Sequence, residues 1–163
     1  MKKLSLMTAI IVISFIIQTS LLNFINIIGT VPNLSLIVVV IFALMSNSII
    51  GGLIGIITGL LYDALIYDIF GVYIMIYFII GSIIGTYSDD MLRENYAAYS
   101  IVTAISTVVG HFMLYLILFF LRYRVGYASN ILGSIIIEII INSVLVIFVL
   151  KLIRFTFDKL NVK

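Results

Sequence analysis

The chain has 163 residues, of which 64% are hydrophobic and 10% are charged, whereas a soluble domain is about 45–50% apolar and about 25% charged. This composition excludes a disordered chain, a nucleic-acid-binding protein and an ordinary soluble enzyme. It indicates a polytopic, all-α membrane protein with almost no extramembrane domain. The absence of cysteine excludes disulfides and thiolate metal sites, and a single histidine disfavours a zinc site.

The first 62 residues set the expected number of membrane crossings. No side chain from Leu4 to Tyr62 is charged, a stretch of 59 residues. As one helix it would be about 88 Å long, and a bilayer core is about 30 Å thick, so it holds up to three crossings. Lys2 and Lys3 precede a first span that we expect to remain uncleaved, because no small-residue cleavage site closes it.

Breaks in the apolar pattern divide the chain into six expected spans within one membrane domain, residues 1–163. Their approximate ranges are 4–28, 34–45, 49–66, 72–87, 97–121 and 131–153. The only proline, Pro32, falls between the first and the second span. The second and third spans are short for a full crossing, so a tilted, broken or re-entrant arrangement stays open.

The distribution of lysine and arginine predicts the orientation in the membrane. With six spans both ends of the chain lie on one side, together with seven basic residues, and two basic residues lie opposite. The positive-inside rule then places both termini in the cytoplasm. The seven are Lys2, Lys3, Arg93, Lys151, Arg154, Lys159 and Lys163, and the two are Arg122 and Arg124.

Glycines recur every four residues in the third expected span, and the same spacing appears in the fourth. They are Gly51, Gly55 and Gly59, and then Gly81 and Gly85. Residues four apart share one face of a helix, and glycine lets another helix approach that face closely. The spacing predicts helix packing within the chain, with a docking face for a partner membrane protein as the alternative.

Asp63 continues the glycine row of the third span and is expected near the outer membrane boundary. A carboxylate there can bond to the backbone or pair with an outer arginine. The alternatives are a contact with a partner or a place in a polar cavity. Asp68, also expected on the outer side, lies five positions on, which gives little support for a hydrolytic carboxylate pair.

The fifth and sixth spans hold the only clearly intramembrane ionisable residues, His111 and Glu138, each in a row of polar residues. The rows are Thr103, Thr107, His111 and Tyr115, and then Ser134, Glu138 and Asn142. His111 and Glu138 lie about 15 Å and about 11 Å from the outer ends of their spans. We expect them to pair and to form, with Asn142, a structural polar clasp; a proton relay or a ligand site is the alternative.

A series of short motifs runs from the first span to the fourth. The first span ends with Gln18 and Thr19 before a break, and Gln18 is expected to hydrogen-bond to a neighbouring helix. Pro32-Asn33-Leu34 then opens the second span, and G-I-I-T-G-L-L-Y-D follows from Gly55 to Asp63. The positions in the series are Pro32, Asn33, Gly55, Gly59, Asp63, Gly71, Gly81 and Gly85.

This series resembles the rod shape-determining protein MreD family. The resemblance implies a six-helix membrane fold similar to the substrate-binding subunits of energy-coupling-factor transporters, and a non-enzymatic scaffold role in bacterial cell-wall elongation at the inner membrane. It implies MreC, a periplasmic scaffold with one membrane span, as partner. Through MreC it implies links to MreB, RodA and a class B penicillin-binding protein. It implies no catalytic residue, cofactor or metal.

Two other function classes stay open from the sequence. One is a vitamin-binding transporter subunit, although Ser5 and Ala9 offer only a weak small-residue pair for docking to an energising module. The other is a small membrane enzyme or a proton-coupled carrier built on His111 and Glu138. The sequence contains no G-x-S-x-G, H-E-x-x-H, P-loop or G-x-G-x-x-G motif.

Overall fold

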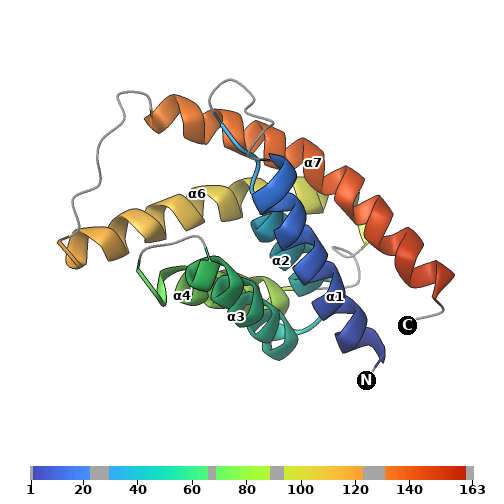
Figure 1. The fold of residues 1–163 in the computed structure, drawn as a ribbon. Coiled ribbons are helices and arrows are strands. Elements are labelled where there is room, and N and C mark those ends of the chain that lie inside the picture. Colours follow the sequence, from blue (N-terminus) through green and yellow to red (C-terminus); the bar gives the residue numbers. More distant parts are fainter. Residues whose placement is uncertain (1, 23–29, 66–68, 89–93, 123–130, 161–163) are drawn as a thin grey trace.

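A computed structural model describes residues 2–22, 30–65, 69–88, 94–122 and 131–160. Over these residues the chain is all-α, with six α-helices and one short π-helix, η1 (Figure 1). The α-helices are α1 (Lys2–Ile17), α2 (Leu34–Leu44), α3 (Ser48–Leu65), α4 (Val72–Thr86), α6 (Tyr96–Phe120) and α7 (Ile131–Lys159), and η1 (Gln18–Leu22) continues α1. The expected all-α fold with six helices is confirmed.

The helix α2 is the centre of the bundle. All eleven of its residues are buried, and it contacts α1, α3, α4, α6 and α7. Its sequence explains this position, because a helix that is apolar on every side is stable only when neighbours surround it. At about 16 Å it is much shorter than a bilayer core of about 30 Å.

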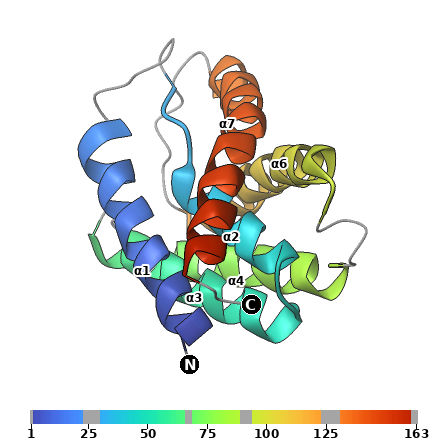
Figure 2. The same cartoon turned by 90° about the vertical axis from the view of Figure 1, so that its right-hand side faces the viewer.

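Three of the described helices are long and apolar enough to cross a membrane, namely α3, α6 and the part of α7 from Gly133 to Lys159. The shorter apolar helices are Ser5–Ser20, α2 and α4. α3 and α4 lie side by side, and α6 and α7 form a second pair (Figures 1 and 2). The start of α1 and the end of α7 lie at the same end of the molecule (Figures 1 and 2), as an even number of crossings requires.

The last helix is longer than the sequence pattern predicted. We expected the sixth span to end near residue 153, but α7 continues to Lys159. The extension is stable because Ile153 and Phe157, four positions apart, are both buried against the core, and the Phe157 ring packs 6.2 Å from that of Phe42. Arg154 lies on the same turn, over the rings of Tyr96 and Tyr99.

Candidate functional site

The glycine row of α3 faces α4 and brings the two backbones into contact. A Cβ atom added to any of its three glycines would lie under 3.0 Å from backbone atoms of α4. The opposing positions are Gly51 with Gly81, Gly55 with Tyr77, and Gly59 with Ile74. A Cβ added to Gly85 of α4 would likewise lie under 3.0 Å from a backbone atom, in this case Asn47 O at 2.6 Å. The glycines therefore form an internal interface, and α4 covers the face that a partner would otherwise use.

Asp63 closes this interface at the start of α4. Its Oδ2 accepts hydrogen bonds from the backbone N–H groups of Gly71 and Ile74, and its Oδ1 accepts one from Tyr73, each at 3.0 Å. The residue at the N-cap position of α4 is Gly71, which has no side chain to cap with and adopts φ 103°. Asp63 is 3% exposed. It is thus a carboxylate that caps a neighbouring helix, where a negative charge also meets the positive end of the helix dipole.

Three tyrosine rings connect this cap to the interior of the protein. Tyr62 packs against Tyr73 at 4.4 Å and against Tyr77 at 6.2 Å between ring centroids. The Tyr77 hydroxyl then donates to Asn33 Oδ1 at 3.2 Å. The tyrosines therefore link the α3–α4 pair to the beginning of α2.

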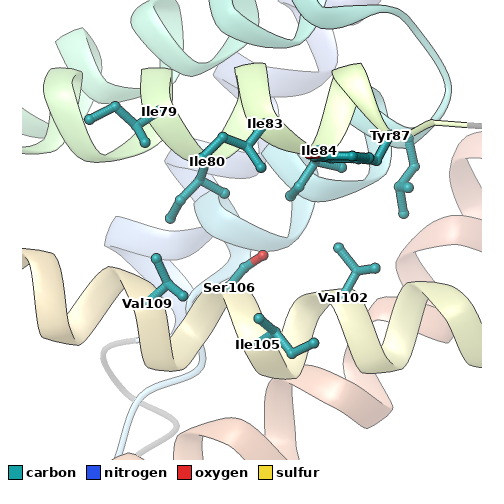
Figure 3. Close-up of a pocket in the computed structure, with 10 residues that line it drawn as sticks. Ile79, Ile80, Ile83, Ile84, Tyr87, Val102, Ile105, Ser106 and Val109 are labelled. Carbon is teal, nitrogen blue, oxygen red and sulfur yellow. The ribbon is translucent and has the colours of Figure 1, made fainter.

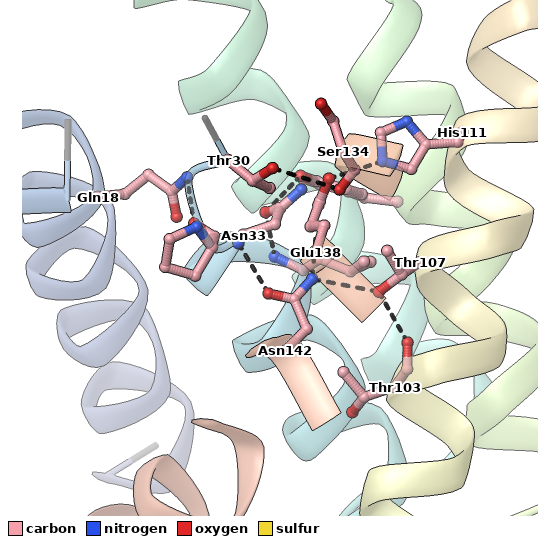
Figure 4. Close-up of polar contacts among 12 residues, drawn as sticks. Gln18, Thr30, Asn33, Thr103, Thr107, His111, Ser134, Glu138 and Asn142 are labelled. Carbon is pink, nitrogen blue, oxygen red and sulfur yellow. Dashed lines mark hydrogen bonds and ion pairs between the residues drawn. The ribbon is translucent and has the colours of Figure 1, made fainter. Parts of the chain in front are cut away.

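The start of α2 lies inside the protein and is held by side chains from other helices (Figure 4). Gln18 Oε1 accepts from the backbone N–H of Leu34 at 2.6 Å and of Ser35 at 3.2 Å, and its Nε2 donates to Pro32 O at 3.2 Å. Asn33 Oδ1 accepts from Leu36 N at 2.9 Å, which is an N-cap bond. Non-helical backbone at membrane depth is tolerated only where the protein satisfies it, and these bonds meet that requirement.

A polar clasp joins α6 and α7 next to this helix start (Figure 4). His111 Nε2 lies 2.7 Å from Glu138 Oε2. Asn142 Nδ2 donates to Thr107 Oγ1 at 3.2 Å and to Glu138 Oε1 at 3.4 Å. Asn142 Oδ1 accepts from Asn33 N at 2.9 Å. Asn142 therefore connects α7 to both α6 and the backbone before α2.

A small cavity of about 30 Å³ adjoins the clasp, lined in part by Asn33, Tyr77, His111 and Glu138. A cavity needs at least about 10–15 Å³ of such volume to hold one water molecule, whereas pockets for small-molecule ligands measure about 300–1,000 Å³. The cavity thus has room for water but not for a vitamin-sized ligand. No group of three or more histidine, aspartate and glutamate residues that could hold a metal ion occurs in the described part of the chain.

A family model for the rod shape-determining protein MreD matches residues 1–156. The chain belongs to the MreD family. The match spans the α3–α4 interface, the start of α2 and the clasp, and it gives the protein a role in rod shape determination. No curated protein and no solved structure matches the chain.

In this MreD family member, each motif position that the structure describes makes a specific local contact or supplies a specific backbone conformation. The backbone carbonyl of Pro32 accepts from Gln18, and the backbone N–H of Asn33 donates to Asn142. Gly71 supplies the left-handed turn before α4. Arg93, Arg124 and Lys163, on which part of the orientation argument depends, lie outside the described residues, as does Asp68.

The sequence did not predict the hydrogen bond from Tyr77 to Asn33 or the one from Asn142 to Thr107. It also did not identify the start of α2 as the partner of Gln18. Gln18 carried a usable signal, because an amide in an otherwise apolar helix requires a polar partner. Tyr77 carried none, because a tyrosine at this position of an apolar helix is equally compatible with the membrane interface.

Proposed function

We propose that this protein is a non-enzymatic membrane scaffold of the bacterial cell-wall elongation machinery, located in the inner membrane with both termini in the cytoplasm. In this proposal it binds MreC and is linked through MreC to MreB, RodA and a class B penicillin-binding protein. The observation that carries the proposal is the match of the MreD family model to residues 1–156.

The interior geometry supports a scaffold rather than a carrier or an enzyme. The polar groups of the clasp bond to one another and to the start of α2, and the adjoining cavity of about 30 Å³ leaves no space for a substrate. The same argument disfavours a vitamin site beside the clasp. We infer that Asp63, the α3–α4 glycines and the clasp hold the helices in register, and that partners contact outward-facing surfaces.

Co-purification with MreC tests this proposal. The tagged chain would be expressed with MreC from the same genome and extracted in mild detergent, with an unrelated single-span membrane protein as the control. We expect MreC to be recovered in a fixed ratio and the control protein to be absent. Recovery of a tightly held small molecule without MreC would contradict the scaffold and favour the transporter subunit.

A complementation experiment tests the role in cells. The chain would replace the resident MreD of a rod-shaped bacterium, and cell width would be measured by microscopy. We expect rods with the chain and round cells without it. Round cells despite normal membrane levels and MreC binding would show that binding alone does not account for the function.

A further inference from the structure

The polar cavity beside the clasp lies where four parts of the chain meet. The residues that line it include Asn33 before α2, Tyr77 on α4, Thr107 and His111 on α6, and Glu138 on α7. Figure 4 shows Asn33, Thr107 and His111 gathered around Glu138. The volume of about 30 Å³ is enough for about one or two water molecules, because one needs about 10–15 Å³.

Asn33 contributes an amide donor to this cavity. Its Oδ1 accepts from the backbone N–H of Leu36 and from the Tyr77 hydroxyl. Because a backbone N–H can only donate, these bonds fix Oδ1 on the side of Leu36 and identify the other end of the amide as Nδ2. Nδ2 has no hydrogen-bond partner among the residues that the structure describes. An amide donor without a partner at membrane depth costs free energy, so an acceptor bound in the cavity would stabilise the fold.

Two other residues on the cavity retain the capacity to accept hydrogen bonds. The Tyr77 hydroxyl uses its proton for the bond to Asn33, so its oxygen can still accept. In Glu138, Oε1 accepts from Asn142 and Oε2 pairs with His111, and each carboxylate oxygen can accept more than one bond. The cavity is therefore lined by one available donor and by acceptors from two different helices.

We propose that this cavity is a binding site for an ordered water molecule. The water accepts a hydrogen bond from Asn33 Nδ2 and donates to the Tyr77 oxygen and to the Glu138 carboxylate, and about three bonds are typical of buried water. It thereby links α4 to the clasp residue of α7 through the segment before α2. His111, whose side chain is 35% exposed, is both a wall of the cavity and a part of the protein surface, so water can enter beside it.

The combination of a donor with acceptors favours water over a metal cation. Hard cations bind through oxygen ligands, and the Nδ2 hydrogens of Asn33 would repel them. Water both donates and accepts, so one molecule can satisfy the amide of Asn33 together with the carboxylate of Glu138.

A larger groove between α4 and α6 offers water a different environment (Figure 3). Its volume is about 250 Å³, and its walls are mainly branched aliphatic side chains, among them Ile80, Ile83 and Ile105. Cavities with apolar walls stay dry, because water finds too few polar partners in them. Bound water is therefore expected beside Tyr77 and not beside Ile80, although the two residues lie about one turn apart on α4.

Hydroxyl-radical footprinting with short X-ray pulses tests the site, because radicals formed from a bound water oxidise the side chains beside it even where bulk water has no access. The matched control for Tyr77 is Tyr99 on α6, since the two tyrosines are 1% and 0% exposed and Tyr99 does not line the cavity. Oxidation of each would be measured by peptide mass spectrometry on the full chain in lipid nanodiscs. We expect Tyr77 to be oxidised several-fold faster than Tyr99. Equal rates, or a faster rate at Tyr99, would overturn the proposal.

Filling the cavity provides a second measurement. Gly110 lines it, and the one described atom within 4 Å of a Cβ added there is Ile80 Cδ1 at 3.8 Å, so Gly110→Val has room for a side chain that displaces the water. Gly133→Val on α7 is the control, because no described atom lies within 4 Å of its added Cβ. We expect oxidation of Tyr77 to fall to the level of Tyr99 in Gly110→Val and to persist in Gly133→Val.

The remaining outcomes decide between water and its alternatives. Undiminished oxidation of Tyr77 in a Gly110→Val protein that melts like the unmodified chain would overturn the proposal. If Gly110→Val does not fold, the comparison of Tyr77 with Tyr99 in the unmodified chain decides alone. Suppression of Tyr77 oxidation by sodium chloride, but not by choline chloride at the same concentration, would assign the cavity to a cation and overturn the water site. None of these measurements involves a partner protein, so their results leave the proposed scaffold role untouched.

Discussion

Asp63 at the end of α3 accepts a hydrogen bond from the backbone N–H of Gly71 and so caps a helix to which it does not belong. Two further bonds, from Tyr73 and Ile74, complete the cap. Gly71 has no side chain that could cap α4, and it adopts a left-handed conformation. The N-terminus of α4 is therefore capped by the carboxylate of Asp63, a residue of α3. The pairing explains why the G-x-x-x-G-L-x-x-D stretch is followed by a glycine eight residues later.

Loss of the Asp63 carboxylate should destabilise the α3–α4 pair. Asp63→Ala leaves three partly buried N–H groups without their acceptor, and one buried group of this kind costs about 1–3 kcal/mol. Asp63→Asn keeps one acceptor oxygen, so it should lose about 1 kcal/mol, the size of an ordinary cap. Thermal unfolding in detergent would be followed by far-UV circular dichroism, because the chain has no tryptophan.

The matched control for the cap is Asp158→Asn, which changes an exposed carboxylate near the end of α7. It should stay within about 0.5 kcal/mol of the unmodified chain, as surface substitutions do. Equal melting of Asp63→Ala and Asp158→Asn would show that the cap contributes nothing to stability.

The α3–α4 interface could be predicted from the sequence only in part. The four-residue spacing of Gly51, Gly55 and Gly59 identified a face for close approach, but spacing does not name the helix that approaches. The sequence allowed Asp63 to bond to the backbone, but it did not identify the start of α4 as the partner, because the bond from Gly71 N–H to Asp63 depends on the path of the segment between α3 and α4.

The clasp was more predictable than the start of α2. His111 and Glu138 could be paired because both are costly to leave alone in a membrane and lie at similar depths on helices adjacent in the chain. The network from Gln18 to Asn33 and Asn142 joins residues more than 100 positions apart. No local pattern encodes such contacts. The sixth span was expected to end near Ile153, whereas the helix continues past Arg154, which lies over two tyrosine rings.

Gly55→Ala should weaken folding through a steric clash. The added Cβ would meet the backbone carbonyl of Tyr77, and a backbone atom cannot move aside without separating α3 from α4. Overpacking of this kind costs about 1–3 kcal/mol, which should lower both the melting temperature and the yield of monodisperse protein.

Gly133→Ala in α7 provides the comparison for Gly55, because nothing lies within 4 Å of its added Cβ. There alanine should leave stability unchanged or raise it by up to about 1 kcal/mol through helix propensity. Equal melting temperatures of Gly55→Ala and Gly133→Ala would show that α3 and α4 do not pack as closely as they do in the structure.

Gln18→Met should destabilise the start of α2. Methionine has a similar shape but no amide, so the N–H groups of Leu34 and Ser35 lose their acceptor and Pro32 O loses its donor. We expect a loss of at least about 2 kcal/mol, because each orphaned group costs about 1–3 kcal/mol. Gln18→Glu keeps the acceptor oxygens but loses the donor to Pro32 O, so it should melt above Gln18→Met. The reverse order would exclude capping as the role of Gln18.

Two substitutions of Glu138 separate a structural clasp from proton chemistry. Glu138→Gln keeps an oxygen that accepts from His111 and a group of nearly the same volume, whereas Glu138→Leu leaves His111 and Asn142 without their shared partner. A clasp predicts that the glutamine variant retains most stability and restores rod shape, while the leucine variant loses about 1–3 kcal/mol and restores it poorly. Proton-coupled function predicts that both fail in cells although Glu138→Gln melts normally. Melting curves and cell-width measurements on the same two variants therefore distinguish the roles, and a round-cell phenotype of a stable Glu138→Gln protein would exclude the purely structural clasp.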